Sequence, residues 1–152
     1  MSDSFTLRYA NKADAAAITR LELWSAQHEA RVYPLPPYPE LCAIWRNRLE
    51  QQTHVVILAQ TDAELIGFAA IARPVKKGFL LALYIAPHFF RRGVGSTLLQ
   101  YAERLVRAEG GRQLFLEVEE RNLRAQAFYR AQQYLPQAQY VDGHLIPYRK
   151  RW

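Results

Sequence analysis

One stretch, residues 79–134, constrains the fold of this chain more than any other. It opens with the apolar segment Phe79–Ala86, which a proline closes, and continues into a basic turn that contains Gly93 and Gly95. An amphipathic segment from Thr97 to Glu109 follows, with apolar residues at helical spacing. This order predicts a strand, a glycine turn and a helix, and the turn is typical of a site for an anionic ligand.

A further strand and a short helix complete the stretch. Residues 114–119 alternate, so that the apolar side chains are predicted on one face and Glu117 and Glu119 on the other. Asn122 is a suitable N-cap for a helix that ends near Gln132. Strand, anion-binding turn, helix, strand and helix therefore follow one another within this stretch.

The first half of the chain predicts three strands and two helices. Apolar patterning indicates strands at residues 5–10, 55–59 and 65–72, the last two joined as an antiparallel hairpin. Helical spacing indicates helices over Asp14–Glu29 and Glu40–Gln51, separated by a proline-rich extended segment.

The end of the chain predicts two more strands. Asp142-Gly143 is a hairpin signal between them, and Pro147 inside the last strand suggests a bulge or a late start of that strand. No repeat, low-complexity tract or linker interrupts the sequence. Residues 1–152 are therefore predicted to form one mixed α/β domain.

Composition narrows the classes of function. With 50% hydrophobic and 22% charged residues the chain is globular, and no apolar run approaches the roughly 20 residues of a membrane span. The single cysteine, Cys42, and the lack of a leader-like start favour the cytoplasm. The four histidines are scattered, so no metal site is expected. A net charge of +6 suits a nucleotide-containing cofactor or nucleic acid, but the charge is dispersed and no nucleic-acid motif is present.

Three features of the glycine turn favour phosphate binding over a plain strand-to-helix connection. Glycine lets the backbone approach a ligand closely, and the helix N-terminus attracts anions. Arg91 and Arg92 add two permanent positive charges. A dinucleotide fold would need a third glycine where Leu98 stands, and the lysine of a phosphate-binding loop is also missing.

Residues 79–134 resemble the acyl-CoA-binding core of the GNAT superfamily of N-acetyltransferases. The family's turn, Arg/Gln-x-x-Gly-x-Gly/Ala, is matched at Gly93 and Gly95, with Phe90 at its first position. The later signature, Asn-x-x-Ala-x-x-aromatic/Leu-Tyr, is matched by Asn122, Ala125, Phe128 and Tyr129. Gln133-Tyr134 replaces the Gly-Phe that usually follows.

The resemblance implies a central, mostly antiparallel twisted sheet of about six to seven strands, with a splayed pair and about four flanking helices. It implies an N-acetyltransferase that moves an acetyl group from acetyl-CoA to a primary amine of a small molecule or a peptide, by direct attack and without a metal. Many relatives carry a glutamate on the strand before the turn, where this chain has Leu80, Leu81, Ala82 and Leu83. The alternative is a catalytically silent acyl-CoA-binding module for sensing or assembly, which Phe90 and the absence of that glutamate would favour. The exposed final strands would permit a homodimer.

The resemblance also assigns the cofactor contacts by position. The pantetheine arm is expected along the backbone of Leu83, Tyr84 and Ile85 and beside Asn122. The pyrophosphate is expected at the turn, which comprises Arg91, Arg92, Gly93, Val94, Gly95 and Ser96. Plain helix capping is the alternative interpretation of Asn122.

Two residues are expected to take part in the chemistry. Tyr129 would lie near the thioester sulfur as a general acid, with core packing as the alternative. Glu117 matches the glutamate that the N-terminal-alanine acetyltransferases of ribosomal proteins use, and it is the candidate base; a solvated carboxylate is the alternative. A base matters most for an alkylamine, since deprotonation at pH 7 costs about 4.6 kcal/mol for a pKa of about 10.4 and about 1.4 kcal/mol for an α-amine.

The acceptor itself cannot be identified from the sequence. The first two helices, their proline-rich connection and the final hairpin are expected to shape its pocket. The aromatic residues that could line this pocket, or that could simply pack, are Trp24, Tyr33, Tyr38 and Tyr140.

Overall fold

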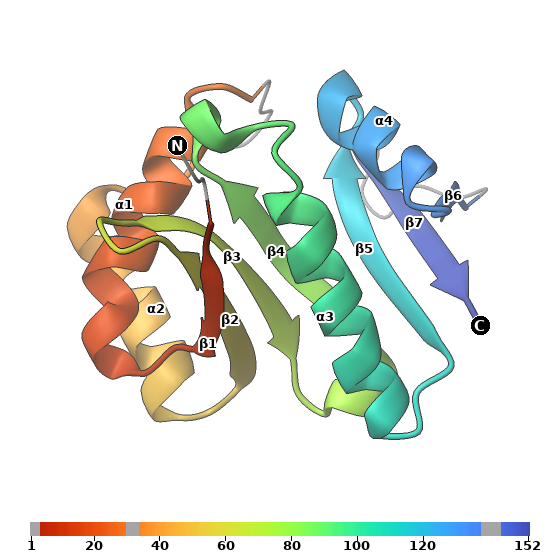
Figure 1. The fold of residues 1–152 in the computed structure, drawn as a ribbon, viewed down its shortest axis with the longest axis horizontal. Helices are drawn as coiled ribbons and strands as arrows, with labels where there is room; N and C mark the ends of the chain where they lie inside the picture. Colours follow the sequence, from red (N-terminus) through yellow and green to blue (C-terminus); the bar gives the residue numbers. More distant parts are fainter. Residues whose placement is uncertain (1–3, 30–33, 138–143) are drawn as a thin grey trace.

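The computed structural model describes residues 4–29, 34–137 and 144–152 of the chain. In these ranges the chain forms seven strands and four α-helices, arranged as two antiparallel sheets with flanking helices (Figure 1). The expected mixed α/β class, with its mostly antiparallel strands, is confirmed. The predicted turn at Asp142-Gly143 lies outside the described residues, as do Tyr33 and Tyr140.

The larger sheet comes from the first half of the chain and follows the predicted strand pattern. Its strands are β1 (Thr6–Tyr9), β2 (His54–Gln60), β3 (Leu65–Ala72) and β4 (Leu80–Ile85), paired in this order and antiparallel throughout. β2 and β3 form the predicted hairpin and are almost continuously buried. Because these strands are buried on both faces of the sheet, other elements must pack against both faces.

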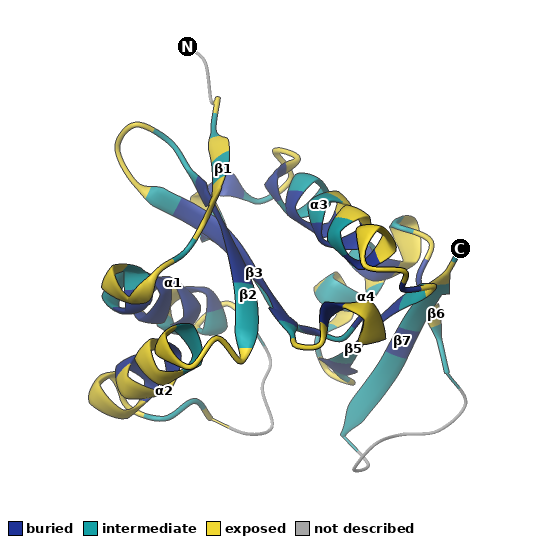
Figure 2. Ribbon diagram, turned by 90° about the horizontal axis from the view of Figure 1, so that it is seen from below, coloured by how far each residue is buried: buried dark blue, intermediate teal, exposed yellow. Residues whose placement is uncertain are grey.

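Helices supply that cover (Figure 2). α1 (Ala15–Ala26) and α2 (Tyr38–Glu50) lie on one face, and α3 (Val94–Ala108) lies on the other. α1 ends three residues earlier than predicted, whereas α2 begins two residues earlier because Pro39 fits a first helical turn, where no N–H donor is needed. α3 begins three residues earlier than predicted, directly after Gly93.

The last third of the chain forms the smaller sheet. Its strands are β5 (Gln113–Glu119), β7 (Leu145–Arg151) and β6 (Leu135–Pro136) in spatial order, and α4 (Leu123–Ala131) follows β5 in the chain. β7 pairs with β5 without a register shift, so the suggested bulge at Pro147 is wrong. The Pro147 carbonyl accepts a hydrogen bond from the Gln137 N–H at 2.8 Å, on the β6 side. The missing N–H of Pro147 lies on that same side and leaves the ladder to β5 intact.

The two sheets meet between β4 and β5, which start side by side and then diverge (Figure 1). Within the described residues, their strand pairing is confined to a parallel bridge between Phe79 and Phe115, where the Phe115 N–H donates to the Gly78 carbonyl at 2.7 Å. Beyond this bridge the strands separate, which gives the splayed pair that was expected.

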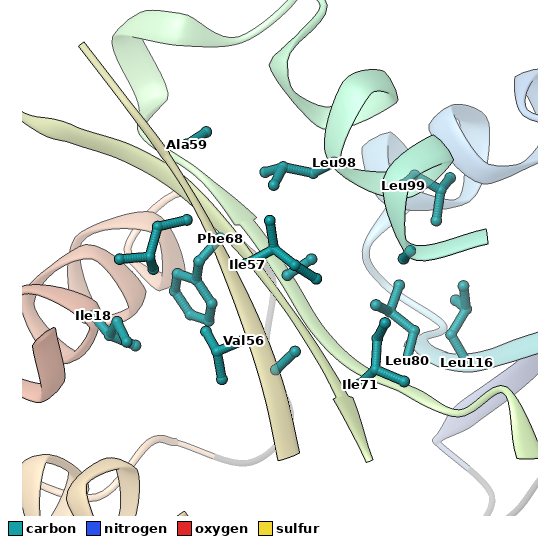
Figure 3. Close-up of a cluster of buried hydrophobic side chains, with 14 of the residues drawn as sticks. Ile18, Val56, Ile57, Ala59, Phe68, Ile71, Leu80, Leu98, Leu99 and Leu116 are labelled. Atoms are coloured by element: carbon teal, nitrogen blue, oxygen red, sulfur yellow. The ribbon is translucent and has the colours of Figure 1, made fainter. Parts of the chain in front are cut away.

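The core lies on both sides of the larger sheet (Figure 3). On one side Phe68 packs against Trp45 of α2, with ring centroids 5.3 Å apart. On the other side Leu98 and Leu99 of α3 lie over apolar side chains of the sheet, and Leu80 and Leu116 continue this layer from β4 to β5. Each fully buried side chain of this size contributes about 1.5–3 kcal/mol to the stability of the fold. The core therefore holds β4 and β5 in place up to the point where the two strands diverge.

In the described ranges no helix combines the length and the hydropathy that a bilayer crossing requires. The same ranges contain no group of three or more His, Cys, Asp or Glu side chains placed to hold a metal ion.

Candidate active site

Two cavities open where β4 and β5 diverge. The first, of about 250 Å³, is the cleft between the two strands themselves. The second, of about 540 Å³, lies at the N-terminus of α3 and extends to α4. The residues that line both are Glu29, Leu83, Asn122, Ala125 and Tyr129. The cavities therefore meet at one small group of side chains.

The glycine turn shapes the mouth of the larger cavity. Gly93 is the N-cap residue of α3 and has a φ of 83°, in the left-handed region that favours glycine. A Cβ on Gly95 would lie 3.3 Å from the ring of Phe128, so this glycine lets α3 and α4 approach closely. The first N–H groups of α3 have no partner within the helix, and the dipole adds a partial positive charge there.

The six predicted turn residues divide into two groups. Arg91, Gly93, Gly95 and Ser96 line the larger cavity. Arg92 and Val94 are absent from its lining: the Arg92 guanidinium lies 5.3 Å from the ring centroid of Phe89, and Val94 is buried in the core. A contact of Arg92 with the pyrophosphate therefore stays a prediction, and Val94 could contribute only through its backbone.

Arg124, which sequence reasoning missed, adds a positive charge to the same cavity. Its guanidinium lies 4.0 Å from the ring centroid of Phe90, and its Nη2 donates to the His28 carbonyl at 3.0 Å. Phe90, which departs from the family pattern, thus provides the surface on which a nearby arginine stacks. A lone arginine in the first turn of a helix carries no distinctive signal, because most such residues are simply solvated.

The strand and cap residues assigned to the pantetheine arm also lie at the cavities. Leu83 and Ile85 line the larger one, and Leu83 and Tyr84 line the cleft. Tyr84 pairs in register with Phe68, which places its ring on the face that α2 covers. Asn122 Oδ1 accepts a hydrogen bond from the Ala125 N–H at 3.1 Å, so this residue caps α4 and lines both cavities as well.

Tyr129 lies at the junction of the cavities and is 8% exposed. Burial raises the pKa of its hydroxyl, and the nearby Tyr84 and Glu29 raise it further. Its ring packs against Tyr134, with centroids 5.8 Å apart. The hydroxyl therefore remains protonated at neutral pH and can act as a hydrogen-bond donor.

Three carboxylates line the cleft: Glu117 and Glu119 from β5, and Glu29 from the turn that follows α1. The Glu29 N–H donates to the Ala26 carbonyl at 3.1 Å, which continues α1 by a turn. Sequence reasoning assigned no role to Glu29, because only the tertiary fold brings the end of α1 next to β4 and Tyr129.

The backbone of β5 also contributes to the cleft. Because the Pro147 carbonyl points toward β6 and this residue has no N–H, the pair of Pro147 and Glu117 exchanges no hydrogen bonds. The N–H and C=O of Glu117 therefore point away from β7, toward β4.

The two aromatic acceptor candidates in the described ranges lie elsewhere. Trp24 stacks on His88, with ring centroids 5.2 Å apart, and lines neither cavity. Tyr38 is exposed at the start of α2 and is also absent from both linings.

Comparisons with known proteins agree with this fold. A stretch of 73 residues is 37% identical to the peptidyl-lysine N-acetyltransferase YiaC of Escherichia coli K12 and spans 48% of this chain and 44% of that relative. The fold is similar to that of the PaiA N-acetyltransferase of Thermoplasma acidophilum, solved with coenzyme A, at a TM-score of 0.80 and 22% identity over 98% of this chain and 99% of that one. It is also similar to YncA of Salmonella typhimurium, solved with its cofactor acetyl-CoA, at a TM-score of 0.75 and 18% identity over 98% and 94%.

The model of the acetyltransferase (GNAT) family matches residues 18–134, which is more than half of the chain. The matched range begins within α1 and includes the glycine turn, Glu117 and Tyr129. The predicted assignment to an acyltransferase is thereby confirmed, and the chain belongs to the GNAT family of acetyltransferases.

Proposed function

We propose that this protein transfers an acetyl group from acetyl-CoA to a primary amine by direct attack. The observation that carries the proposal is the junction of the two cavities at Leu83 and Tyr129. Direct transfer requires both substrates to touch at the reacting atoms, and holding them in this geometry lowers the barrier. A basic cavity for the donor and an acidic cleft for the acceptor, which meet at one point, satisfy that requirement.

The larger cavity suits coenzyme A. The N–H groups at the start of α3, together with Arg91 and Arg124, would hold the pyrophosphate, and each charge-assisted hydrogen bond contributes about 1.5–3 kcal/mol. The backbone of β4 near Leu83 and Ile85 would take the pantetheine arm, and Asn122 lies beside its path. PaiA and YncA, which share the fold, were solved with coenzyme A and acetyl-CoA. When bound, the cofactor supplies the acyl thioester.

Glu117 would prepare the amine for attack. An alkylammonium must lose a proton before its nitrogen can attack the thioester carbonyl, and a carboxylate in the cleft can take that proton directly or through water. The neutral nitrogen then forms the C–N bond, the C–S bond breaks, and the thiolate leaves. The second proton of the amine is lost as the intermediate collapses and passes, through water, to the departing thiolate, which is released as the free thiol.

Tyr129 would stabilise the departing thiolate. A thiol with a pKa of about 8.5 leaves readily, and the raised pKa of the Tyr129 hydroxyl means that a full proton transfer to sulfur is unfavourable. The hydroxyl therefore acts as a hydrogen-bond donor to the negative charge that develops on sulfur.

Thiol release from acetyl-CoA tests the proposal. The purified protein is expected to release free thiol in the presence of alkylamines, and Glu117→Gln is expected to lower kcat/KM more for an alkylamine than for an α-amine, since the alkylamine depends more on a base. Glu120→Gln, which neutralises an exposed carboxylate three residues further along the chain, is the matched control.

The proposal fails if acetyl-CoA binds and no amine in a broad panel is acetylated. That result would favour the silent acyl-CoA-binding module instead. A protein that shows no heat of binding with acetyl-CoA would contradict both functions.

A further inference from the structure

The positive charge of this chain is dispersed along the sequence, but the fold gathers part of it at one end of the molecule. Four segments meet there: the connection from β3 to β4, the last turn of α3, the turn before β5, and the end of β7. Each contributes exposed cationic side chains. The six residues, which we call the basic end, are Arg73, Lys76, Lys77, Arg107, Arg112 and Arg151.

Backbone contacts bring these four segments together. The Lys76 carbonyl lies so close to Gly111 that a Cβ there would be 2.6 Å from its oxygen. Trp152, which directly follows β7, donates from its backbone N–H to the Arg112 carbonyl at 3.1 Å and from its indole Nε1 to the Gly111 carbonyl at 2.9 Å. The Arg107 guanidinium lies 4.5 Å from the centroid of the same indole. The basic end is therefore one surface, at the end of α3 that lies away from the glycine turn (Figure 1).

The charge of the basic end is largely uncompensated. None of its six side chains forms an ion pair with a carboxylate of the described residues. Glu109 lines a shallow cavity beside Arg73 and Lys76, and Glu50 faces Arg73 across a wider groove. Six cations against two carboxylates leave a surplus of positive charge at this end.

The basic end is separate from the candidate active site. None of its six residues lines the cleft or the larger cavity. The larger cavity begins at Ile85, at the far end of β4, and the rise of a strand places Ile85 about 16 Å from Leu80, where β4 starts. That separation exceeds the screening length of about 8 Å at physiological ionic strength. A ligand of the basic end therefore need not compete with the coenzyme.

The composition of the basic end indicates the kind of partner. Protein–protein interfaces have aromatic and apolar side chains at their centre and few charges, whereas interfaces with nucleic acid are polar and strongly positive. Four of the six cations are arginines, whose planar fork matches phosphate. The large hydrophobic side chains that the described residues expose all lie outside the four segments: Tyr9, Trp24, Tyr38, Ile44, Leu123 and Leu135.

We propose that the basic end binds the phosphate backbone of nucleic acid, without dependence on base sequence. This inference goes beyond the proposed acetyl transfer and does not rest on it. Binding of this kind releases condensed counterions, so the affinity falls steeply as the salt concentration rises.

Fluorescence anisotropy with a labelled oligonucleotide tests the inference. The whole chain is titrated into a single strand of about 15 nucleotides and into the matching duplex, between about 50 and 200 mM salt. The expected Kd is on the order of 10⁻⁵ M at about 100 mM salt. The logarithm of the affinity is expected to fall linearly with the logarithm of the salt concentration, with a slope of up to about −4 for the single strand if all six cations contact phosphates.

Two double variants with the same loss of charge locate the surface. Arg112→Gln with Arg151→Gln is expected to weaken binding of the single strand about tenfold and to make the slope shallower by about 1.4, because two phosphate contacts are lost. Arg20→Gln with Arg46→Gln removes two equally exposed arginines from α1 and α2, and it is expected to keep most of the affinity. Both double variants should retain the wild-type affinity for acetyl-CoA.

The other outcomes contradict the inference and leave the acetyl transfer untouched. No binding at about 50 mM salt, or equal losses in the two double variants, would show that the basic end has no special role. Displacement of the oligonucleotide by saturating coenzyme A would place it in the larger cavity instead. Tighter binding of an acidic peptide or of anionic lipid vesicles than of the oligonucleotide would contradict the assigned class of partner.

Discussion

Tyr129 combines deep burial with a position at the meeting point of two cavities. Because burial raises the pKa of its hydroxyl, the protonated form persists below and well above neutral pH. Tyr129→Phe removes one hydrogen bond to a developing thiolate, worth about 1.5–3 kcal/mol, and kcat is expected to fall about 10- to 100-fold. The measurement is kcat against pH from 7 to 10.

The wild-type profile should show no loss of activity from ionisation of Tyr129 in that range. The Phe variant should keep the Kd for acetyl-CoA within about threefold, which separates a catalytic role from a packing role. An unchanged kcat in the Phe variant would contradict the role of the hydroxyl.

Gln133 occupies the position where the family usually has glycine, and the structure shows why glycine is usual there. Its φ is 76°, a left-handed conformation that costs a non-glycine residue about 1–2 kcal/mol. Glycine loses about 0.5–1 kcal/mol more backbone entropy on folding. Gln133→Gly is therefore expected to raise the free energy of unfolding by about 0.5–1 kcal/mol in urea denaturation, whereas Gln133→Ala, which keeps the Cβ, should not.

At the scale of elements, a polar network joins α3 to the smaller sheet. Glu103 of α3 is 7% exposed, and it accepts hydrogen bonds from the Tyr134 hydroxyl at 2.8 Å and from Lys150 of β7 at 3.3 Å. The tyrosine that replaces the family's usual phenylalanine thus satisfies a buried carboxylate. The network fixes α3, whose N-terminus forms the mouth of the larger cavity, relative to β7.

Tyr134→Phe would leave that carboxylate with one donor fewer. The expected loss is about 1–3 kcal/mol in the free energy of unfolding, measured in urea. Tyr148→Phe is the matched control: Tyr148 is equally buried, but its hydroxyl donates to the neutral Oε1 of Gln126 at 3.2 Å, so its loss should be smaller. Equal losses would show that the charge on Glu103 is unimportant.

Tyr134 also makes the free energy of unfolding depend on pH. Burial and the hydrogen bond to Glu103 raise the pKa of Tyr134 above its usual value. Its contribution to stability is fully present below the unfolded pKa of about 10 and declines as the pH rises above that value. Unfolding measured between pH 8 and 11 should show this decline, and Tyr134→Phe should reduce it.

At the scale of the molecule, the site exists because two sheets share one core but separate at one end. A ligand that binds between them binds only the folded chain and therefore stabilises it. At 100 times its Kd, coenzyme A should add about 2.7 kcal/mol, which corresponds to a rise in Tm of roughly 5–10 °C for a chain of this size. A thermal scan with and without the coenzyme checks this.

The double variant Arg91→Ala with Arg124→Ala removes the two arginines that line the larger cavity, so it should lose most of the shift. Lys12→Ala, an exposed cation at another cavity, should retain it. No shift at millimolar coenzyme A would contradict the assignment of the larger cavity.

Much of the fold and part of the site could be predicted from local sequence. Alternating and helical patterns placed β2, β3, β5, α2 and α4 within a few residues, because those periods reflect which face of an element is buried. Gly93 marked the start of α3, although the helix begins before the amphipathic pattern becomes regular. Arg91 of the turn, with Asn122 and Tyr129 of the later signature, lines the larger cavity, and the roles assigned to these residues stay predictions.

The sequence by itself therefore determined the elements, the basic glycine turn and the family, since each depends on residues that are near one another along the chain. Only the tertiary structure decided which carboxylates share the cleft and that Arg124 stacks on Phe90. Glu29 and Glu117 are far apart in sequence, and the divergence of β4 from β5 brings them into one cavity. Electrostatic interaction depends on distance in space, and separation along the chain does not reveal that distance.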